Sequence, residues 1–291
     1  ESKNITELYD DLTGETVYKV FLPAAAGRFD ENLWVERVRQ LSSVFTKYTA
    51  VKYSQVSLTY DSGFSRFVNS EGSEFKKPYC YGAIDIAGVT YSPDGYKLGA
   101  GSRFGFCGAA DLPSFETIVK KAEEIAGRLT AMSKSVPMKA YIGPVFFEEN
   151  AAAKFFEHFF VMNVAYPREI WKETNKWDTN PVYRRAGELV ERLDMRVMPP
   201  FLNVVDDPLA KDYNGAALMG HYEVDDEGVP ARKVKLVEKG RLKDIYRSRT
   251  ATRDFNKSNG HGRGEYHEVI TGGPGNVFIE PEDNPARVLS S

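Results

Sequence analysis

Glu157 and His158 are the side chains best suited to chemistry, and they lie in a strongly apolar run, Ala151–Met162. In a helical zinc peptidase site two histidines stand at i and i+4, and a glutamate activates the metal-bound water. Here the order is Glu-His, and Met162 and Asn163 stand where a second histidine would be needed. The sequence favours a core or interface role for His158. An active metallopeptidase with a non-standard ligand set around His158 stays open.

Such an alternative ligand set would draw on His221, His261 and His267, with Glu157 as the base. His261 and His267 bracket a glycine-rich stretch that also holds Glu265 and Glu268. The spacing of these residues matches no familiar zinc pattern. Solvated loop histidines are therefore the favoured interpretation, and no metal is predicted.

Two acidic clusters could supply carboxylates for acid–base chemistry or for a hard cation. They are Asp206-Asp207 and Asp225-Asp226-Glu227, and each precedes a turn-forming residue, Pro208 or Gly228. Asp and Gly at strand ends are what turns require. Both clusters are therefore predicted to form turns.

The segment Gly260–Gly264 has a glycine at every second position. No convincing helix follows it, so the dinucleotide-binding interpretation is weak. Glycines could instead let the backbone approach a peptide closely. We therefore predict peptide contacts from Asn259, Gly260 and Arg263, with a plain mobile loop as the alternative.

Cys107 could act as a nucleophile, but no histidine is near in sequence, so a buried thiol is favoured. Its only companion is Cys80. Two cysteines are too few for a disulfide framework, and they favour a reducing compartment, although one bridge is not excluded.

The overall composition is that of a soluble globular protein. The chain has 291 residues, 42% of them hydrophobic, and a net charge of -3. It has no basic block that would indicate nucleic acid and no apolar run near the roughly 20 residues of a membrane helix. It starts at Glu1 without a signal-like segment, so a processed protein or an excised piece of a longer one is predicted. The expected location is the cytoplasm.

The elements that must position these residues follow from periodicity and turn signals. Residues 51–108 alternate like an antiparallel meander, with a hairpin turn at Asp61–Gly63. Glu238–Gly240 is predicted to be a second tight turn. The remaining expected elements are helices at Glu31–Thr46, Ser114–Ser133, Asn150–Asn163 (capped by Asn150) and Arg184–Leu193, and strands at Thr16–Leu22, Gly143–Phe147, within residues 200–247, and at Asn276–Pro281.

Several segments together resemble the TldD/PmbA family of metalloprotease-like proteins, also called modulators of DNA gyrase. The matching segments run from about residue 30 to 282. They are FVNSEGS (67–73), GPVFFEENAAAKFF (143–156), PFLNVVDDP (200–208), YEVDDEGVPARKVKLVEKGRLKDIYRSRTATRDF (222–255), SNGHGR (258–263), PGNVFIEP (274–281) and the helix 115–129.

In active family members the matching helix carries HExxxH, which falls here on Glu157, His158 and Met162. Both histidine ligands are therefore absent, and the family's distal cysteine ligand would lie beyond Ser291. The chain is thus most similar to the PmbA/TldE-type branch, which lacks the zinc motif.

The resemblance implies an α+β fold of bent antiparallel sheets with packed helices, which we expect to divide at residues 1–135 and 136–291. It implies a non-catalytic protein that binds extended unfolded peptides and has no zinc of its own. The implied partner is an identical chain or an active TldD-type subunit. A structural or regulatory scaffold without a peptide site is the further alternative.

Overall fold

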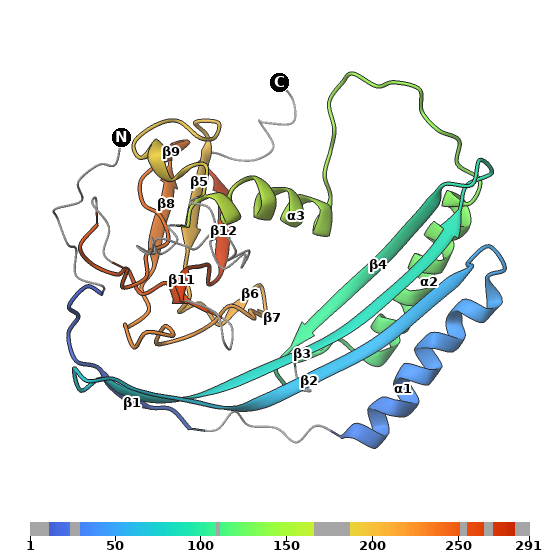
Figure 1. The fold of residues 1–291 in the computed structure, drawn as a ribbon. Helices are drawn as coiled ribbons and strands as arrows, with labels where there is room; N and C mark the ends of the chain where they lie inside the picture. Colours follow the sequence, from blue (N-terminus) through green and yellow to red (C-terminus); the bar gives the residue numbers. More distant parts are fainter. Residues whose placement is uncertain are drawn as a thin grey trace, which may run out of the picture.

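The computed structural model describes residues 12–23, 30–108, 111–165, 187–250, 255–264 and 270–282. A long curved sheet carries two helices on its outer side, and a smaller group of short strands lies on its concave side (Figure 1). Antiparallel sheets and a few helices make this an α+β fold, as predicted.

The long sheet is built on β3 (Glu74–Tyr91), which pairs antiparallel with β2 (Tyr53–Val68) along one edge. Its other edge is shared by β4 (Lys97–Phe106), which pairs with residues 82–91, and by the short parallel strand β1 (Lys19–Phe21). The predicted strand Thr16–Leu22 is therefore shorter than expected.

Two helices cover the convex face of this sheet, namely α1 (Glu31–Val44), continued by η1 (Phe45–Lys47), and α2 (Phe115–Met132). Asp30 and Ser114 cap them, because each side chain accepts a hydrogen bond from the backbone N–H three residues on. Their buried faces meet the inward residues of β2–β4, such as Ile84 and Phe106. Both helix predictions are confirmed.

The predicted hairpin turn at Asp61–Gly63 is wrong, because β2 runs straight through these residues. Gly63 pairs with Tyr79, whose hydroxyl would lie 2.7 Å from a Cβ at position 63. The glycine therefore marks the place where an aromatic ring crosses the strand. The true turn follows Val68, where Gly72 has φ of 96°.

The C-terminal sheet has the order β12–β5–β8–β9, with all neighbours antiparallel. The turn between β8 and β9 at Lys239-Gly240 is confirmed, and both residues have positive φ. A second hydrophobic core forms here, around Leu236, Ile245 and Tyr246. The strands are β5 (Leu202–Asp206), β8 (Val234–Glu238), β9 (Arg241–Leu242) and β12 (Val277–Pro281), beside the small pairs β6 (Asp212–Tyr213) with β7 (Ala216–Ala217) and β10 (Gly262–Arg263) with β11 (Thr271–Gly272).

Helix α3 (Glu149–Phe159) is followed by η3 (Val161–Asn163). Its N-cap residue is Glu148, whose side chain makes no capping hydrogen bond, and not Asn150 as predicted. The residues before it, 143–147, form no strand, which corrects that prediction. Of the helix predicted at Arg184–Leu193, the described part holds only the short turn η4 (Val190–Arg192).

Cys80 and Cys107 form a disulfide that joins β3 to the residue after β4. This overturns the favoured interpretation of Cys107 as a buried free thiol, and it is the single bridge that the sequence left open. Across the residues that the structure describes, no helix combines the length and apolar character that a bilayer crossing requires.

Candidate functional site

Helix α3 and the η3 turn place the three degenerate motif positions on an open surface. Glu157 forms an ion pair with Lys154, the His158 side chain is exposed, and Met162 is 56% exposed. One imidazole beside a paired carboxylate and a thioether does not make the donor set of a zinc site. Zinc therefore does not fit these positions, and in the part of the chain that the structure describes no group of three or more His, Cys, Asp or Glu could hold a metal ion.

The other described histidines have partners of their own. His221 Nδ1 lies 2.9 Å from the Pro208 carbonyl oxygen. His261 is fully buried, with Nδ1 3.2 Å from the Asn259 carbonyl and Nε2 3.4 Å from Asp206 Oδ1. They do not join His158 in a ligand set. His267, with Glu265 and Glu268, lies outside the described residues.

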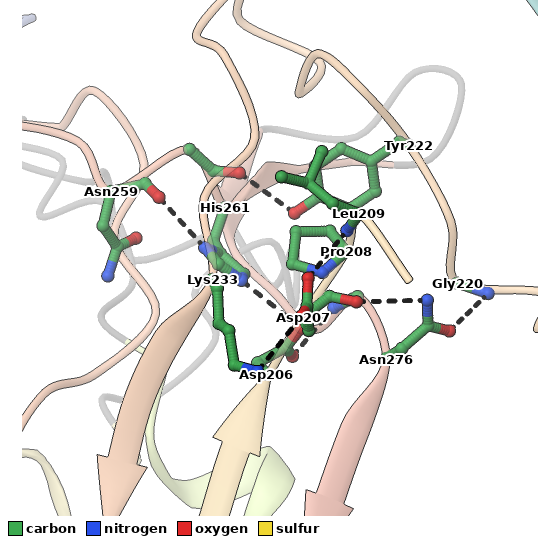
Figure 2. A network of polar contacts seen from close by, with 12 residues as sticks. Asp206, Asp207, Pro208, Leu209, Gly220, Tyr222, Lys233, Asn259, His261 and Asn276 are labelled. Atoms are coloured by element: carbon green, nitrogen blue, oxygen red, sulfur yellow. Dashed lines mark hydrogen bonds and ion pairs between the residues drawn. The ribbon is translucent and has the colours of Figure 1, made fainter. Parts of the chain in front are cut away.

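A buried polar core surrounds His261, and Figure 2 shows its main contacts. Asp206 at the end of β5 accepts a hydrogen bond from Gly275 N through Oδ2, while its Oδ1 faces His261. Burial and the Asp206 charge raise the pKa of Tyr246, whose ring lies 5.4 Å from that of His261. The core therefore fixes the C-terminal sheet to the loops around it.

The second acidic cluster belongs to the same core. Asp225 is fully buried and accepts hydrogen bonds from the backbone N–H groups of Glu227, Val229 and Gly262. Burial raises its pKa to about 6, and these hydrogen bonds oppose the rise. The bonds close the turn at Gly228, which has φ of 85°. The carboxylates thus shape turns, as predicted.

The loop Ser258–Gly262 is buried and packed against its neighbours in the fold. The Asn259 side chain donates to the Ile245 carbonyl and accepts from Arg247 N, and Gly260 is buried with φ of 76°. Arg263 stacks on the Tyr222 ring and remains partly exposed. The predicted peptide contacts stay predictions, but Asn259 and Gly260 are enclosed by the fold, so only Arg263 can reach a ligand in this conformation.

Residues next to the polar core also bind the turn end of the β2–β3 hairpin, near Glu71 and Lys77. Lys77 Nζ donates to the carbonyl of Val224 at 2.9 Å and to Asp226 Oδ1 at 2.8 Å. Arg249 donates to Glu71 and to the Thr13 carbonyl. Sequence reasoning missed both cations, whose partners are far away along the chain. The only local signal was a charged residue, Lys77, in an otherwise apolar alternation.

Strand β4 offers an open edge, because among the described residues it pairs only with β3. The N–H of Leu22, the residue after β1, donates to the carbonyl of Lys76 in β3. The main-chain groups of even-numbered β3 residues therefore point to the edge at which β1 and β4 pair with β3. The β3–β4 register pairs even with even residues. The outward main-chain groups of β4 therefore belong to exposed odd positions. These are Gly99, Gly101, Arg103 and Gly105.

An aromatic depression of about 490 Å³ lies on α3. The rings of Phe147 and Phe155 stack at 5.2 Å, and those of Phe155 and Phe159 at 5.6 Å. Phe156 and Phe160, on the other side of the helix, pack into the C-terminal core. The depression is lined by Phe147, Ala151, Lys154, Phe155, His158 and Phe159.

Solved structures with this fold come from bacteria and archaea. A candidate modulator of a DNA gyrase from Thermotoga maritima aligns with a TM-score of 0.60 at 16% identity, covering 96% of this chain and 59% of its own. TldE from Thermococcus kodakarensis aligns with a TM-score of 0.59 at 16% identity, covering 90% of this chain and 55% of its own. At such identity the likeness shows the fold alone, and this chain spans little more than half the length of these proteins.

Two family models cover most of the chain. The PmbA/TldA metallopeptidase central domain matches residues 24–130, and the PmbA/TldA metallopeptidase C-terminal domain matches residues 140–290. No curated protein matches the chain. The two matches show that this chain belongs to the PmbA/TldA metallopeptidase family.

Proposed function

We propose that this chain is a non-catalytic member of the family that binds an extended, unfolded peptide and presents it to a peptidase partner. The partner is a second subunit that carries an intact zinc motif. The peptide adds to the long sheet as a further strand along β4. Main-chain hydrogen bonds then supply affinity with little demand on sequence, which suits a protein that handles unfolded chains.

The free edge of β4 is the observation that carries this proposal. Every second residue from Gly99 to Gly105 directs its N–H and C=O outward and is exposed. At roughly 3.4 Å per residue, this edge matches an extended segment of about seven residues. Three of these four residues are glycines, so no Cβ flanks their outward main-chain groups and a peptide backbone can approach them closely.

The residues of α3 support the non-catalytic part of the proposal. A paired Glu157, an exposed His158 and the thioether of Met162 replace the ligand set that would activate water. We expect the purified chain to bind no stoichiometric zinc, and added zinc not to induce cleavage of an unfolded protein. Metal analysis that finds about one zinc per chain, together with cleavage, would establish the altered-ligand peptidase instead.

A proline at position 99 tests the edge. Gly99→Pro removes one outward N–H without breaking a bond to β3, and the nearest atom to a Cβ there is Gly88 O at 3.6 Å. Fluorescence anisotropy with a labelled unstructured nonapeptide should show affinity lowered about tenfold. Gly99→Ala, which keeps every donor, is the matched control and should bind like wild type. Equal binding by both variants would place the peptide elsewhere, and no binding by wild type would favour a scaffold without a peptide site.

A further inference from the structure

We infer that the aromatic depression on α3 is a selectivity pocket, which takes an aromatic side chain of the bound peptide and favours a carboxylate beside it. This inference rests on the proposed function, because it assumes that a peptide binds, and it names the class of peptide that binds best. Both α3 and the C-terminal strands lie on the concave side of the long sheet, away from α1 and α2 (Figure 1).

Helix α3 has two aromatic faces, and in the part of the chain that the structure describes only one of them enters a hydrophobic core. Phe156 and Phe160 stand four residues apart on the face that enters the C-terminal core. Phe155 and Phe159 repeat the same spacing one residue earlier and are 44% and 46% exposed. Exposed aromatic surface costs hydration free energy, so a cluster of such rings on one helix face indicates a ligand surface.

The geometry of the rings selects an aromatic occupant. Phe155 is nearly parallel to Phe147, at 23°, and to Phe159, at 9°, so the three rings form one offset stack. A stack of this kind extends by a further ring at about 4.5–7 Å. The depression is wide open to solvent, and like ligand sites it combines apolar walls with a few polar groups.

Charged groups at the rim of the aromatic depression determine which residue is preferred next to the bound aromatic residue of the peptide. The polar lining residues are Lys154 and His158, and none of the lining residues is acidic. Lys154 forms an exposed ion pair with Glu157, of the kind that contributes little free energy. A peptide carboxylate can therefore exchange with Glu157 at small cost. An aromatic residue next to an Asp or Glu fits both features of the pocket.

The test compares matched labelled nonapeptides that are otherwise polar and carry Phe-Glu, Ala-Glu or Phe-Lys at the centre. With wild type we expect the Phe-Glu peptide to bind about tenfold more tightly than Ala-Glu. We expect the affinity for Phe-Glu to exceed that for Phe-Lys by about threefold at low salt. This preference for glutamate over lysine should weaken at high salt, because salt screens the attraction to Lys154. Phe155→Ala and Phe159→Ala should each remove the preference for phenylalanine. Lys154→Ala should remove only the preference for glutamate.

Phe146→Ala is the control, because Phe146 is 74% exposed beside the pocket but does not line it. It should leave both preferences unchanged. Equal binding of Phe-Glu and Ala-Glu by wild type overturns the pocket while leaving the edge proposal intact. A preference that survives in the Phe155 and Phe159 variants overturns it too. If these variants instead turn a dimer into a monomer in sedimentation without changing peptide selectivity, the occupant is a second copy of the chain.

Discussion

His261 faces an oxygen at each ring nitrogen, and this constrains its protonation. The Asn259 carbonyl can only accept, so Nδ1 donates to it. Nε2 then meets the Asp206 carboxylate, 3.4 Å away, either as a second donor or as an unprotonated nitrogen that needs a donor. Neither Asp206 Oδ1 nor His261 Nε2 has a hydrogen bond that meets normal geometry.

Substitution of Asp206 separates the hydrogen bonds from the charge. Asp206→Asn can still accept from Gly275 N, and its amide can donate to a neutral His261. We expect the free energy of unfolding in urea to fall by less than about 1 kcal/mol. Asp206→Leu has a similar shape but leaves both groups unpaired, so it should cost about 2–4 kcal/mol. Equal losses in the two variants would mean that an Asp206–imidazolium ion pair is required.

Asp225 gives the fold a pH dependence of known sign. Its pKa is about 6 in the folded chain against 3.8 for the free group, so the folded state holds the proton more tightly between these values. Its ionisation therefore lowers stability as pH rises from about 4 to 6, by up to about 3 kcal/mol. The difference in unfolding free energy, wild type minus Asp225→Asn, should fall across this window. A flat or rising difference in urea titrations would contradict the assignment.

At the scale of elements, local signals predicted the parts that local physics decides. The capped helices α1 and α2 and the turn at Lys239-Gly240 were predicted correctly, because a cap or a positive φ leaves its mark within a few residues. The sequence did not predict that β2 continues through Gly63. That glycine is explained by Tyr79 on the neighbouring strand, and a sequence pattern cannot show which strand will lie beside it.

The turn between β8 and β9 should not tolerate a side chain at its second residue. Gly240 has φ of 72°, and a Cβ there would collide with the carbonyl oxygens of Met198 and Pro199. We expect Gly240→Ala to lower the unfolding free energy by about 2–4 kcal/mol. Gly95→Ala is the control, because Gly95 has φ of 83° with nothing within 4 Å, so it should cost only the backbone term of about 1 kcal/mol. Similar losses at both sites would argue against the collision.

At the scale of the whole molecule, three of the segments that carried the family resemblance converge on one polar core. Asp206, Asp225, Asn259 and His261 come from separate stretches and are all buried. The sequence pattern that indicated the family therefore consists of residues that hold the fold together, and not of residues that carry out a reaction. This explains why the predicted peptide contacts of Asn259 and Gly260 lie inside the fold. The open edge of β4 became visible only once the strand order was known, because the sequence of β4 alternates like any paired strand.

Lys77 links the long sheet to the C-terminal part of the chain around Val224 and Asp226. Its removal should destabilise the end of the β2–β3 hairpin selectively. Burial lowers the pKa of its ammonium and Asp226 opposes this, so the group depends on its partners in the C-terminal half. Lys77→Met keeps the length of the side chain but leaves the Val224 and Asp225 carbonyls without this donor. We expect a loss of about 2–4 kcal/mol in urea unfolding.

Hydrogen exchange locates that loss. In Lys77→Met, amides of the hairpin end between Phe67 and Phe75 should exchange faster, because this end is held against the C-terminal half by Lys77 and by the Arg249–Glu71 pair. Amides of α2 should not change, since they belong to the separate core of the long sheet. Lys76→Met is the matched control: Lys76 lies over the Phe64 ring on the opposite face, so its loss should cost less than about 1 kcal/mol. Uniformly faster exchange in both halves would show that Lys77 stabilises the molecule as one cooperative unit and that the hairpin has no separate opening.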